Sequence, residues 1–302
     1  MEFVMVVLLI IAFIAICIVS KKAKRKRLIE ELKQLILACD TEKVPFERVE
    51  YFCRENDFTD TEYHEIRKNL YYELAKEDDV HALDMAAAYA QNENRAKEIN
   101  YRIRAAKLGH VWSMHYLGLI YAYGEEYVQF RDSKKSFYWF SKAAELGDED
   151  SVVHVARAYE LGEGVEKDEE KAFNILKDYS DRGYSGCSYE LAFSYYGSIG
   201  SSYYNPKLAE QTYNRLMQRG DPEMFAKAAN RLGYFYGHSY IHNSSTDEYS
   251  DRRKAAYCFA LAHFIDPDLC DTDKMKKVGY RWTEFEMKKW AEDAQNLRYN
   301  PM

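Results

Sequence analysis

The chain has 302 residues with a formal net charge of −7, and 47% of the residues are hydrophobic, which is typical of one globular domain or one repeat array. Residues 1–27 alone carry +5, which leaves −12 for residues 28–302. An acidic body without a basic stripe argues against nucleic acid as a partner. The six cysteines show no paired spacing, which excludes a zinc pattern and a disulfide framework and favours free thiols in a reducing compartment.

An uncharged apolar run of seventeen residues, from Phe3 to Val19, opens the chain and leads through Ser20 into the basic residues 21–27. At 1.5 Å per residue the run covers roughly 26 Å, whereas a bilayer core is about 30 Å thick; Ser20 and snorkelling lysines can supply the difference. A cleavable signal peptide needs its positive charge before the apolar run. A buried core helix would not extend this far at a terminus. We therefore expect residues 1–20 to form a transmembrane anchor and residues 21–27 a basic juxtamembrane segment.

All six positive charges of residues 1–27 lie on the C-terminal side of the apolar run. The positive-inside rule then predicts a single-pass membrane protein, in the inner membrane if the source is bacterial, with its N-terminus outside and residues 21–302 in the cytoplasm. The basic segment either sets this topology alone or also contacts anionic headgroups, and the simpler role is favoured.

Residues 28–78 are predicted to be helical without a repeat. Leu28, Leu32, Leu35 and Cys39 fall on one helix face, and residues 59–62 form a capping box. We expect this segment to cover the first repeat and to link it to the anchor. A parallel coiled coil over Leu28–Cys39 would give a weak homodimer, although fewer than two heptads support it.

Glycines recur at intervals of 38, 36 and 37 residues, at Gly109, Gly147, Gly183 and Gly220. Each closes a predicted helix, where glycine takes the left-handed C-cap conformation at the least cost. Twelve residues before each glycine stand Lys97, Lys135, Lys171 and Leu208, and Lys254 occupies the matching place in a last copy. A period of this length predicts stacked helical hairpins.

The first helix of each copy carries a small residue and, three positions later, a tyrosine. Positions three apart share one helix face, so the small residue lets a neighbouring helix approach and the tyrosine fills the groove beside it. The pairs are Ala86 and Tyr89, Gly118 and Tyr121, Ala156 and Tyr159, Ala192 and Tyr195, and Gly233 and Tyr236.

The clearest copy reads SMHYLGLIYAYG…KKSFYWFSKAAELGD from Ser113 to Asp148, and the next reads VARAYELGEGVEKDEEKAFNILKDYSDRG from Val155 to Gly183. These residues resemble the Sel-1-like repeat family, relatives of the tetratricopeptide repeats. The resemblance covers residues 79–266 in about five copies, and later copies are degenerate where Ser198 and Ser239 replace the helix-ending glycine. It implies an all-α protein, a right-handed α/α solenoid that acts as a protein-interaction scaffold, with no catalytic residues.

A second capping box, at residues 283–286, is predicted to open a helix that runs through Trp290 to Leu297. Helical arrays need such a terminal cover over their last apolar face. Residues 267–302 are therefore expected to form a C-terminal capping helix.

The partner-binding surface is predicted from helical phase. If the small residue and the tyrosine of each copy face neighbouring helices, the opposite side of each first helix lines the concave wall of the array. Aromatic residues beside arginine are typical of recognition surfaces. The predicted wall comprises Leu83, Asp84, His115, Tyr116, Leu119, His154, Arg157, Tyr189, Glu190, Phe193, Asn230, Arg231 and Tyr234.

No nucleophile motif and no phosphate-binding glycine loop stand out, so we predict neither an enzyme nor a cofactor or metal site. His238 and His242 are four residues apart, a spacing that suits a metal if the segment is helical, but no third ligand stands nearby. A metal-dependent enzyme is therefore only a remote alternative.

The sequence predicts a membrane-anchored cytoplasmic scaffold or adaptor whose solenoid binds a protein or peptide partner. The alternative is an immunity or inhibitor protein that binds a toxic effector at the membrane, a role that the resemblance implies for some bacterial relatives. A toxin gene immediately upstream would distinguish the two.

Overall fold

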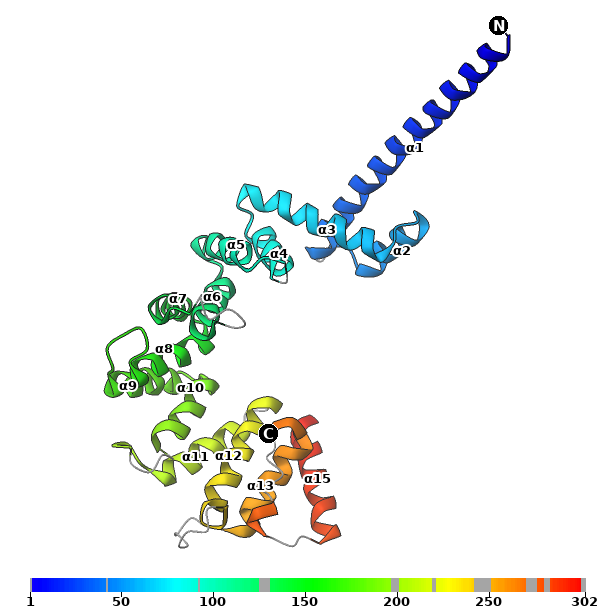
Figure 1. Ribbon diagram of the computed structural model, residues 1–302. Coiled ribbons are helices and arrows are strands. Elements are labelled where there is room, and N and C mark those ends of the chain that lie inside the picture. Colours follow the sequence, from blue (N-terminus) through cyan, green and yellow to red (C-terminus); the bar gives the residue numbers. More distant parts are fainter. Residues whose placement is uncertain are drawn as a thin grey trace. The chain divides into compact units, whose positions relative to one another are not determined.

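The computed structural model describes residues 2–41, 43–91, 93–124, 131–196, 201–218, 221–241, 251–269, 276–279 and 283–299 (Figure 1). Every regular element within these ranges is helical, which confirms the predicted all-α fold. The chain divides into two compact units, Met1–Ser113 and Met114–Met302, and the division falls inside helix α6 (Val111–Tyr123). Each unit is described separately below.

The first unit is built from a long helix followed by two short pairs. Its elements are α1 (Glu2–Asp40), α2 (Phe46–Glu55), α3 (Asp60–Leu74), the 3₁₀ turn η1 (Ala75–Glu77), α4 (Val80–Ala90) and α5 (Arg95–Lys107). The predicted capping box is present at the start of α3, where Thr59 and Glu62 bond each other's backbone N–H groups. Burial of Leu32, Val49 and Tyr71 fixes α1, α2 and α3 to one another.

The predicted membrane anchor is contradicted. Among the residues that the structure describes, no helix has both the length and the apolar character needed to cross a bilayer. Helix α1 runs without a break from Glu2 through the basic segment to Asp40. The predicted single-pass topology, with residues 21–302 placed in the cytoplasm, is therefore wrong.

The basic segment takes part in the first unit's own packing. Arg25 Nη1 donates to the Asn56 carbonyl at 2.8 Å, and Arg25 Nη2 lies 2.9 Å from Glu62 Oε1. The same guanidinium lies over the Phe58 ring, 3.7 Å from its centroid. Arg25 thus ties α1 to α3.

The face proposed for a coiled-coil dimer is covered within the first unit. Leu32 and Ile36 are 0% and 1% exposed, and Leu28, Leu35 and Cys39 pack around the same core. Because this face already contacts α2 and α3, it does not supply a dimer seam.

The second unit is a series of helical hairpins. After α6 come α7 (Ser133–Glu145), α8 (Glu149–Leu161), α9 (Glu169–Asp181), α10 (Ser185–Glu190), the π-helix η3 (Leu191–Tyr196), α11 (Pro206–Met217), α12 (Pro222–Ile241), α13 (Arg252–Ile265), the 3₁₀ turn η4 (Pro267–Leu269) and α15 (Glu284–Tyr299). Consecutive helices pack together, and α10 also contacts both α8 and α12. First helices of neighbouring hairpins therefore lie side by side, as stacked repeats require (Figure 1).

The predicted glycine caps are confirmed where the structure describes them. Gly109, Gly147 and Gly183 have φ of +94°, +93° and +100°, the left-handed region in which glycine is strain-free. Gly220 lies outside the described residues. Ser239, one of the two predicted substitutes for the helix-ending glycine, lies inside α12, so this helix continues to Ile241; Ser198, the other, is not described.

The second helix of every hairpin starts with an Asx cap. The side chains of Asn94, Asp132, Asp168, Asn205 and Asp251 accept from the backbone N–H of Lys97, Lys135, Lys171, Leu208 and Lys254. The residue twelve positions before each glycine is thus the third residue of a capped helix. The sequence displayed this signal, an Asx three residues before each marked position, but the prediction did not use it.

The caps also close the loops back onto the repeat tyrosines. The backbone N–H groups of Asp132, Asp168 and Asp251 donate to the carbonyls of Tyr121, Tyr159 and Tyr236 at 2.8, 2.8 and 2.9 Å. The lysine of each cap lies over the ring of the same tyrosine, 5.3, 4.3 and 5.0 Å from its centroid. In these three hairpins, the backbone hydrogen bond and the lysine–tyrosine contact therefore hold the two ends of the loop together.

The small-residue and tyrosine stripe packs as predicted. A Cβ at Gly118 would lie 2.6 Å from the Phe140 ring, and one at Gly233 would lie 2.8 Å from the Phe259 ring. Tyr121, Tyr195 and Tyr236 are at most 7% exposed. Close approach at the small residue is therefore what lets α7 and α13 pack on the first helices of their hairpins.

The predicted C-terminal capping box is present. The Thr283 N–H donates to Glu286 Oε2 at 2.9 Å, and the Glu286 N–H donates to Thr283 Oγ1 at 3.1 Å. The helix that follows, α15, packs on α13 and buries Trp290 and Ala294. This packing is what the predicted C-terminal cover requires.

Candidate functional site

Leu83 is the predicted wall residue that the structure rules out. This side chain of α4 is fully buried in the core of the first unit. Helix α4 packs against α3 on one side and α5 on the other, so the face assigned to a partner is already occupied.

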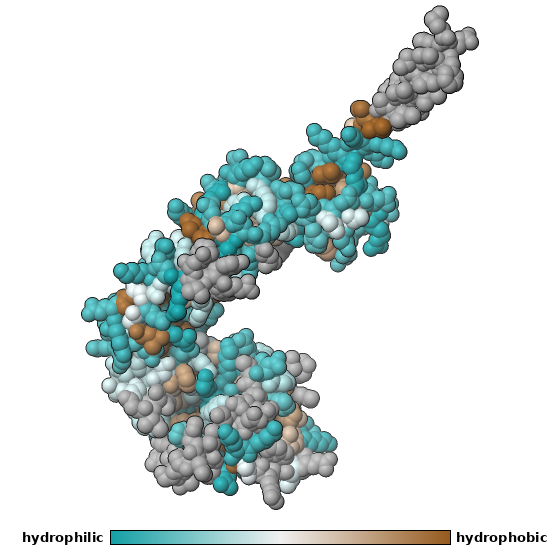
Figure 2. Space-filling view, in the orientation of Figure 1, coloured by the Kyte–Doolittle hydropathy of each residue, from teal (hydrophilic) through white to brown (hydrophobic). Residues whose placement is uncertain are grey.

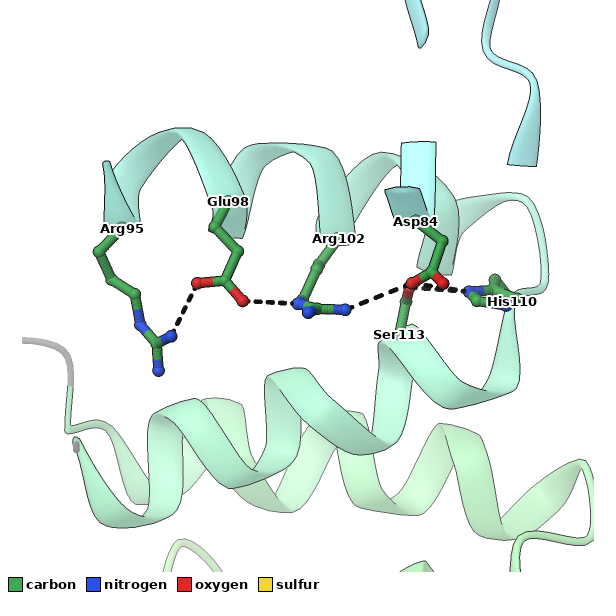
Figure 3. A network of polar contacts seen from close by, with 6 residues as sticks. All are labelled: Asp84, Arg95, Glu98, Arg102, His110 and Ser113. Carbon is green, nitrogen blue, oxygen red and sulfur yellow. Dashed lines mark hydrogen bonds and ion pairs between the residues drawn. The ribbon is translucent and has the colours of Figure 1, made fainter. Parts of the chain in front are cut away.

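Asp84, the next predicted wall residue, ends a chain of charged groups along α5 (Figure 3). Arg95 Nη1 lies 2.7 Å from Glu98 Oε2, Glu98 Oε1 accepts from Arg102 Nε at 2.8 Å, and Arg102 Nη1 lies 3.4 Å from Asp84 Oδ1. We call Asp84, Arg95, Glu98 and Arg102 the ion chain. Glu98 and Arg102 are 0% and 1% exposed, so their charges depend on these partners.

Asp84, His110 and Ser113 are the residue types of a catalytic triad, but their geometry does not form one. His110 Nδ1 lies 2.8 Å from Ser113 Oγ and 3.9 Å from Asp84 Oδ1 (Figure 3). A triad base contacts its acid and its nucleophile through different ring nitrogens, whereas both contacts here use one. Ser113 is also fully buried. We therefore assign these residues to the packing of the first unit.

His115 and His154, predicted on the wall, are held inside the hairpins of the second unit. His115 Nδ1 is 2.9 Å from both Asp148 Oδ2 and Ser151 Oγ. The His154 ring stacks on Phe140 with centroids 4.2 Å apart and planes 12° apart. Burial, followed by the nearby charges of His115 and Arg157, lowers the pKa of His154 to about 4, and Asp148 opposes the shift.

Acid is expected to destabilise the second unit through His154. The imidazole pKa is about 4 in the folded chain against an ordinary value of 6.5, so unfolding takes up a proton between these values. This contribution is complete above about pH 6.5 and falls as the pH decreases toward 4, by up to about 3 kcal/mol. Urea unfolding from pH 4 to 7 should show a smaller pH dependence for His154→Phe, which keeps the stack on Phe140. Equal pH dependence in both proteins would contradict the assignment.

Four predicted wall residues line one cleft. A cleft of about 370 Å³ lies among α8, α10 and α12, and we call it the α8–α10–α12 cleft. Its lining includes Tyr189, Glu190, Asn230 and Arg231 from the predicted wall, together with Asp150 and Lys227.

Arg231 contacts two aromatic residues at this cleft. Its Nε donates to Tyr189 Oη at 2.8 Å, and its guanidinium carbon lies 4.1 Å from the centroid of the Phe193 ring. The Tyr189 ring in turn meets Tyr213 edge to face, with centroids 5.9 Å apart. Burial opposes the charge of Arg231, but the Tyr189 hydrogen bond and the surrounding tyrosines leave its pKa raised, so it stays charged.

Phe193 is exposed and lies in a segment where the helix changes type. Helix α10 passes at Leu191 into the π-helix η3, in which Phe193 is 42% exposed. The wider turn shifts the end of the hairpin by one residue, so the Asn205 N–H donates to Tyr196 instead of Tyr195. Short π segments are frequent at functional sites, and nothing in the sequence signalled this one.

The remaining wall residues of the second unit lie outside this cleft. Arg157 makes a 3.4 Å ion pair with Glu190, and with His154 it lines a smaller cleft of about 200 Å³ near Phe140. Tyr116 and Leu119 on α6 are half-buried. Tyr234 packs edge-on against Phe259, with centroids 5.3 Å apart.

No cluster of metal ligands is found in the part of the chain that the structure describes. Of the two histidines considered as ligands, His238 lies in α12 and His242 falls outside the described residues.

Among the coloured, described residues that face the viewer in Figure 2, small hydrophobic patches are separated by hydrophilic residues. The α8–α10–α12 cleft is distinguished by an arginine that donates to the Tyr189 hydroxyl and lies against the Phe193 ring.

The fold and the cleft define a helical-repeat protein. The Sel1 repeat family matches residues 113–148, 151–177 and 226–262, so the chain contains three Sel1 repeats. Two of these are the central copies predicted above, and the third is a copy that we expected to be degenerate. No curated protein sequence matches the chain.

Two solved structures are similar in fold. A Sel1 repeat protein from Oxalobacter formigenes has a TM-score of 0.51 and 17% identity, covering 76% of this chain and 93% of its own. A protective antigen of uropathogenic Escherichia coli strains, described as displaying an SLR fold, has a TM-score of 0.46 and 15% identity, covering 90% and 84%. The family matches cover three stretches of the chain, and the first of these structural similarities supports a solenoid fold of the Sel1-like repeat type.

Proposed function

We propose that the chain is an adaptor whose repeat region binds an extended segment of a protein partner in the α8–α10–α12 cleft. The observation that carries the proposal is Arg231, held by Tyr189 beside the exposed ring of Phe193. Sel1 repeats are in general protein-interaction modules, and an ordered arginine between aromatic rings is the composition that binding hot spots favour.

The stacking of the hairpins supports an extended ligand. The cleft takes its lining from α8, α10 and α12, which are the first helices of three successive hairpins. Solenoids present such continuous surfaces to partners. In this proposal residues 79–266 form the binding array, and residues 28–78 and 267–302 cover its two ends.

Affinity capture with the full chain tests the proposal. Partners retained from a lysate of the source organism by the wild-type protein should be reduced about tenfold or more by Phe193→Ala, because the exposed Phe193 ring lies against Arg231 of the cleft and an aromatic at a hot spot contributes on the order of 2 kcal/mol. Tyr138→Ala is the matched control, since Tyr138 is an aromatic of α7 with 52% exposure that lies outside the cleft.

Quantitative mass spectrometry of the retained proteins gives the result. Partners lost with Phe193→Ala and kept with Tyr138→Ala support the assigned surface. Equal retention of every specific partner by the wild type and Phe193→Ala would overturn it.

A further inference from the structure

Arg231 is a half-buried cation without an acidic partner among the described residues. Its contacts are the hydrogen bond to Tyr189 and the Phe193 ring, and no Asp or Glu oxygen of the described residues lies within ion-pair distance. The groups that influence its charge are Tyr189, Tyr213 and Tyr234, all of them neutral phenols. Because Arg231 is partly removed from water and has no carboxylate beside it among the described residues, an anionic ligand would find an unpaired guanidinium here.

Two other charged side chains of the cleft, Lys227 and Glu190, have ion-pair partners. Lys227 Nζ lies 2.6 Å from Glu223 Oε1 and also faces Asp150. Glu190 pairs with Arg157 at 3.4 Å. Arg231 is therefore the cation of the cleft that has no carboxylate within ion-pair distance among the described residues, and an anion at its terminal nitrogens would supply that partner.

The orientation of the guanidinium is set before any ligand arrives. Tyr189 fixes its Nε edge and Phe193 lies against its face, which leaves the terminal nitrogens as the remaining donors. A carboxylate matches these two nitrogens with two parallel hydrogen bonds. Prior ordering also lowers the entropy lost on binding.

We propose that Arg231 recognises an acidic side chain, Asp or Glu, within the peptide segment of a protein partner. This inference rests on the proposed function, because it specifies the chemistry of the segment that the α8–α10–α12 cleft binds. Because the cleft is lined by three helices, a bound segment would continue past Arg231 on both sides. This favours recognition of an acidic side chain over recognition of a C-terminal carboxylate.

Selection from a phage-displayed library of random peptides, on the immobilised full chain, supplies the probes. Peptides enriched on the wild type over Phe193→Ala are synthesised with amidated C-termini and measured by fluorescence polarisation. Each is paired with a variant in which one Asp or Glu is replaced by Asn or Gln. A charged hydrogen bond predicts about 10- to 100-fold weaker binding of the amide variant at one position.

The same peptides are then measured against two variants of the protein, Arg231→Gln and Arg231→Lys. The affinities of Arg231→Gln for the acidic and the amide peptide should agree within about twofold. Arg231→Lys should keep only part of the preference for the acidic peptide, because lysine lacks the paired nitrogen donors of a guanidinium. Since the acid-to-amide change is made in the peptide, the wild-type result does not depend on whether either variant folds.

The outcomes separate the two proposals. Peptides that need Phe193 but bind equally as acid and amide would make Arg231 a structural arginine only, overturning this inference and leaving the proposed function intact. A dependence on a free C-terminus in place of an acidic side chain would also overturn it. A selection that enriches nothing on the wild type over Phe193→Ala counts against both proposals.

Discussion

Replacing Glu98 with glutamine is expected to destabilise the first unit by about 3–5 kcal/mol, because the change leaves the buried Arg102 without its closest anion. Arg95 loses the same partner, and the new amide presents N–H donors to groups that are themselves donors. Asp84 Oδ1 lies farther away, 3.4 Å from Arg102 Nη1. Hydrogen exchange of the α4 and α5 amides in the full chain measures the loss within this unit alone.

The controls for this result are a surface pair and a double variant. Glu73→Gln breaks the Glu73–Lys76 ion pair, whose side chains are 69% and 65% exposed, and should cost less than about 1 kcal/mol. The double variant Glu98→Leu with Arg102→Met removes both buried charges and should recover at least half of the loss. If the α5 amides are as strongly protected from hydrogen exchange in the Glu98→Gln variant as in the Glu73→Gln variant, the ion chain has no structural role.

Gly164→Ala should be the more damaging of two glycine substitutions in the second unit. Gly147 and Gly164 have φ of +93° and +78°, so alanine is strained at either position by about 1–2 kcal/mol. A Cβ at Gly147 meets no atom within 4 Å, whereas at Gly164 it would overlap the carbonyl oxygen of Ser133 at the start of α7. That overlap with backbone should add about 1–3 kcal/mol.

Urea unfolding of the two alanine variants, followed by circular dichroism, gives the comparison. Because both positions carry the same left-handed strain, the difference in midpoint isolates the contact between the α8–α9 loop and α7. Equal midpoints would show that α7 shifts to accept the new methyl group, and that this contact is not needed for hairpin packing.

The sequence was sufficient for features that depend on local chemistry. The caps at Gly109 and Gly147, the capping boxes at Thr59 and Thr283, and the pairing of Gly118 with Tyr121 all follow from residues within a few positions of each other. Each requires one conformation that few residue types can adopt, and this is why the pattern could be recognised.

Features that depend on contacts between distant residues were not predictable. Arg102 and Asp84 are 18 residues apart, and Arg231 and Tyr189 are 42 apart, so their pairing required knowledge of which helix faces meet. The π-helix at Leu191 has no sequence signature, and it changes the phase from which the wall had been derived. Leu83 was misplaced because α4 is covered on both sides, a fact that the phase of a single helix does not reveal.

The backbone hydrogen bond that joins the two ends of a loop bears on which insertions the fold can accept. The tyrosine carbonyl and the capping aspartate N–H that it accepts from are 11, 9 and 15 positions apart in the three hairpins. The same backbone hydrogen bond therefore joins the ends of loops of different length, and the packing of the helices does not depend on the number of residues in the loop. New sequence inserted there could lengthen the rim of a hairpin while the stack beneath it keeps its spacing.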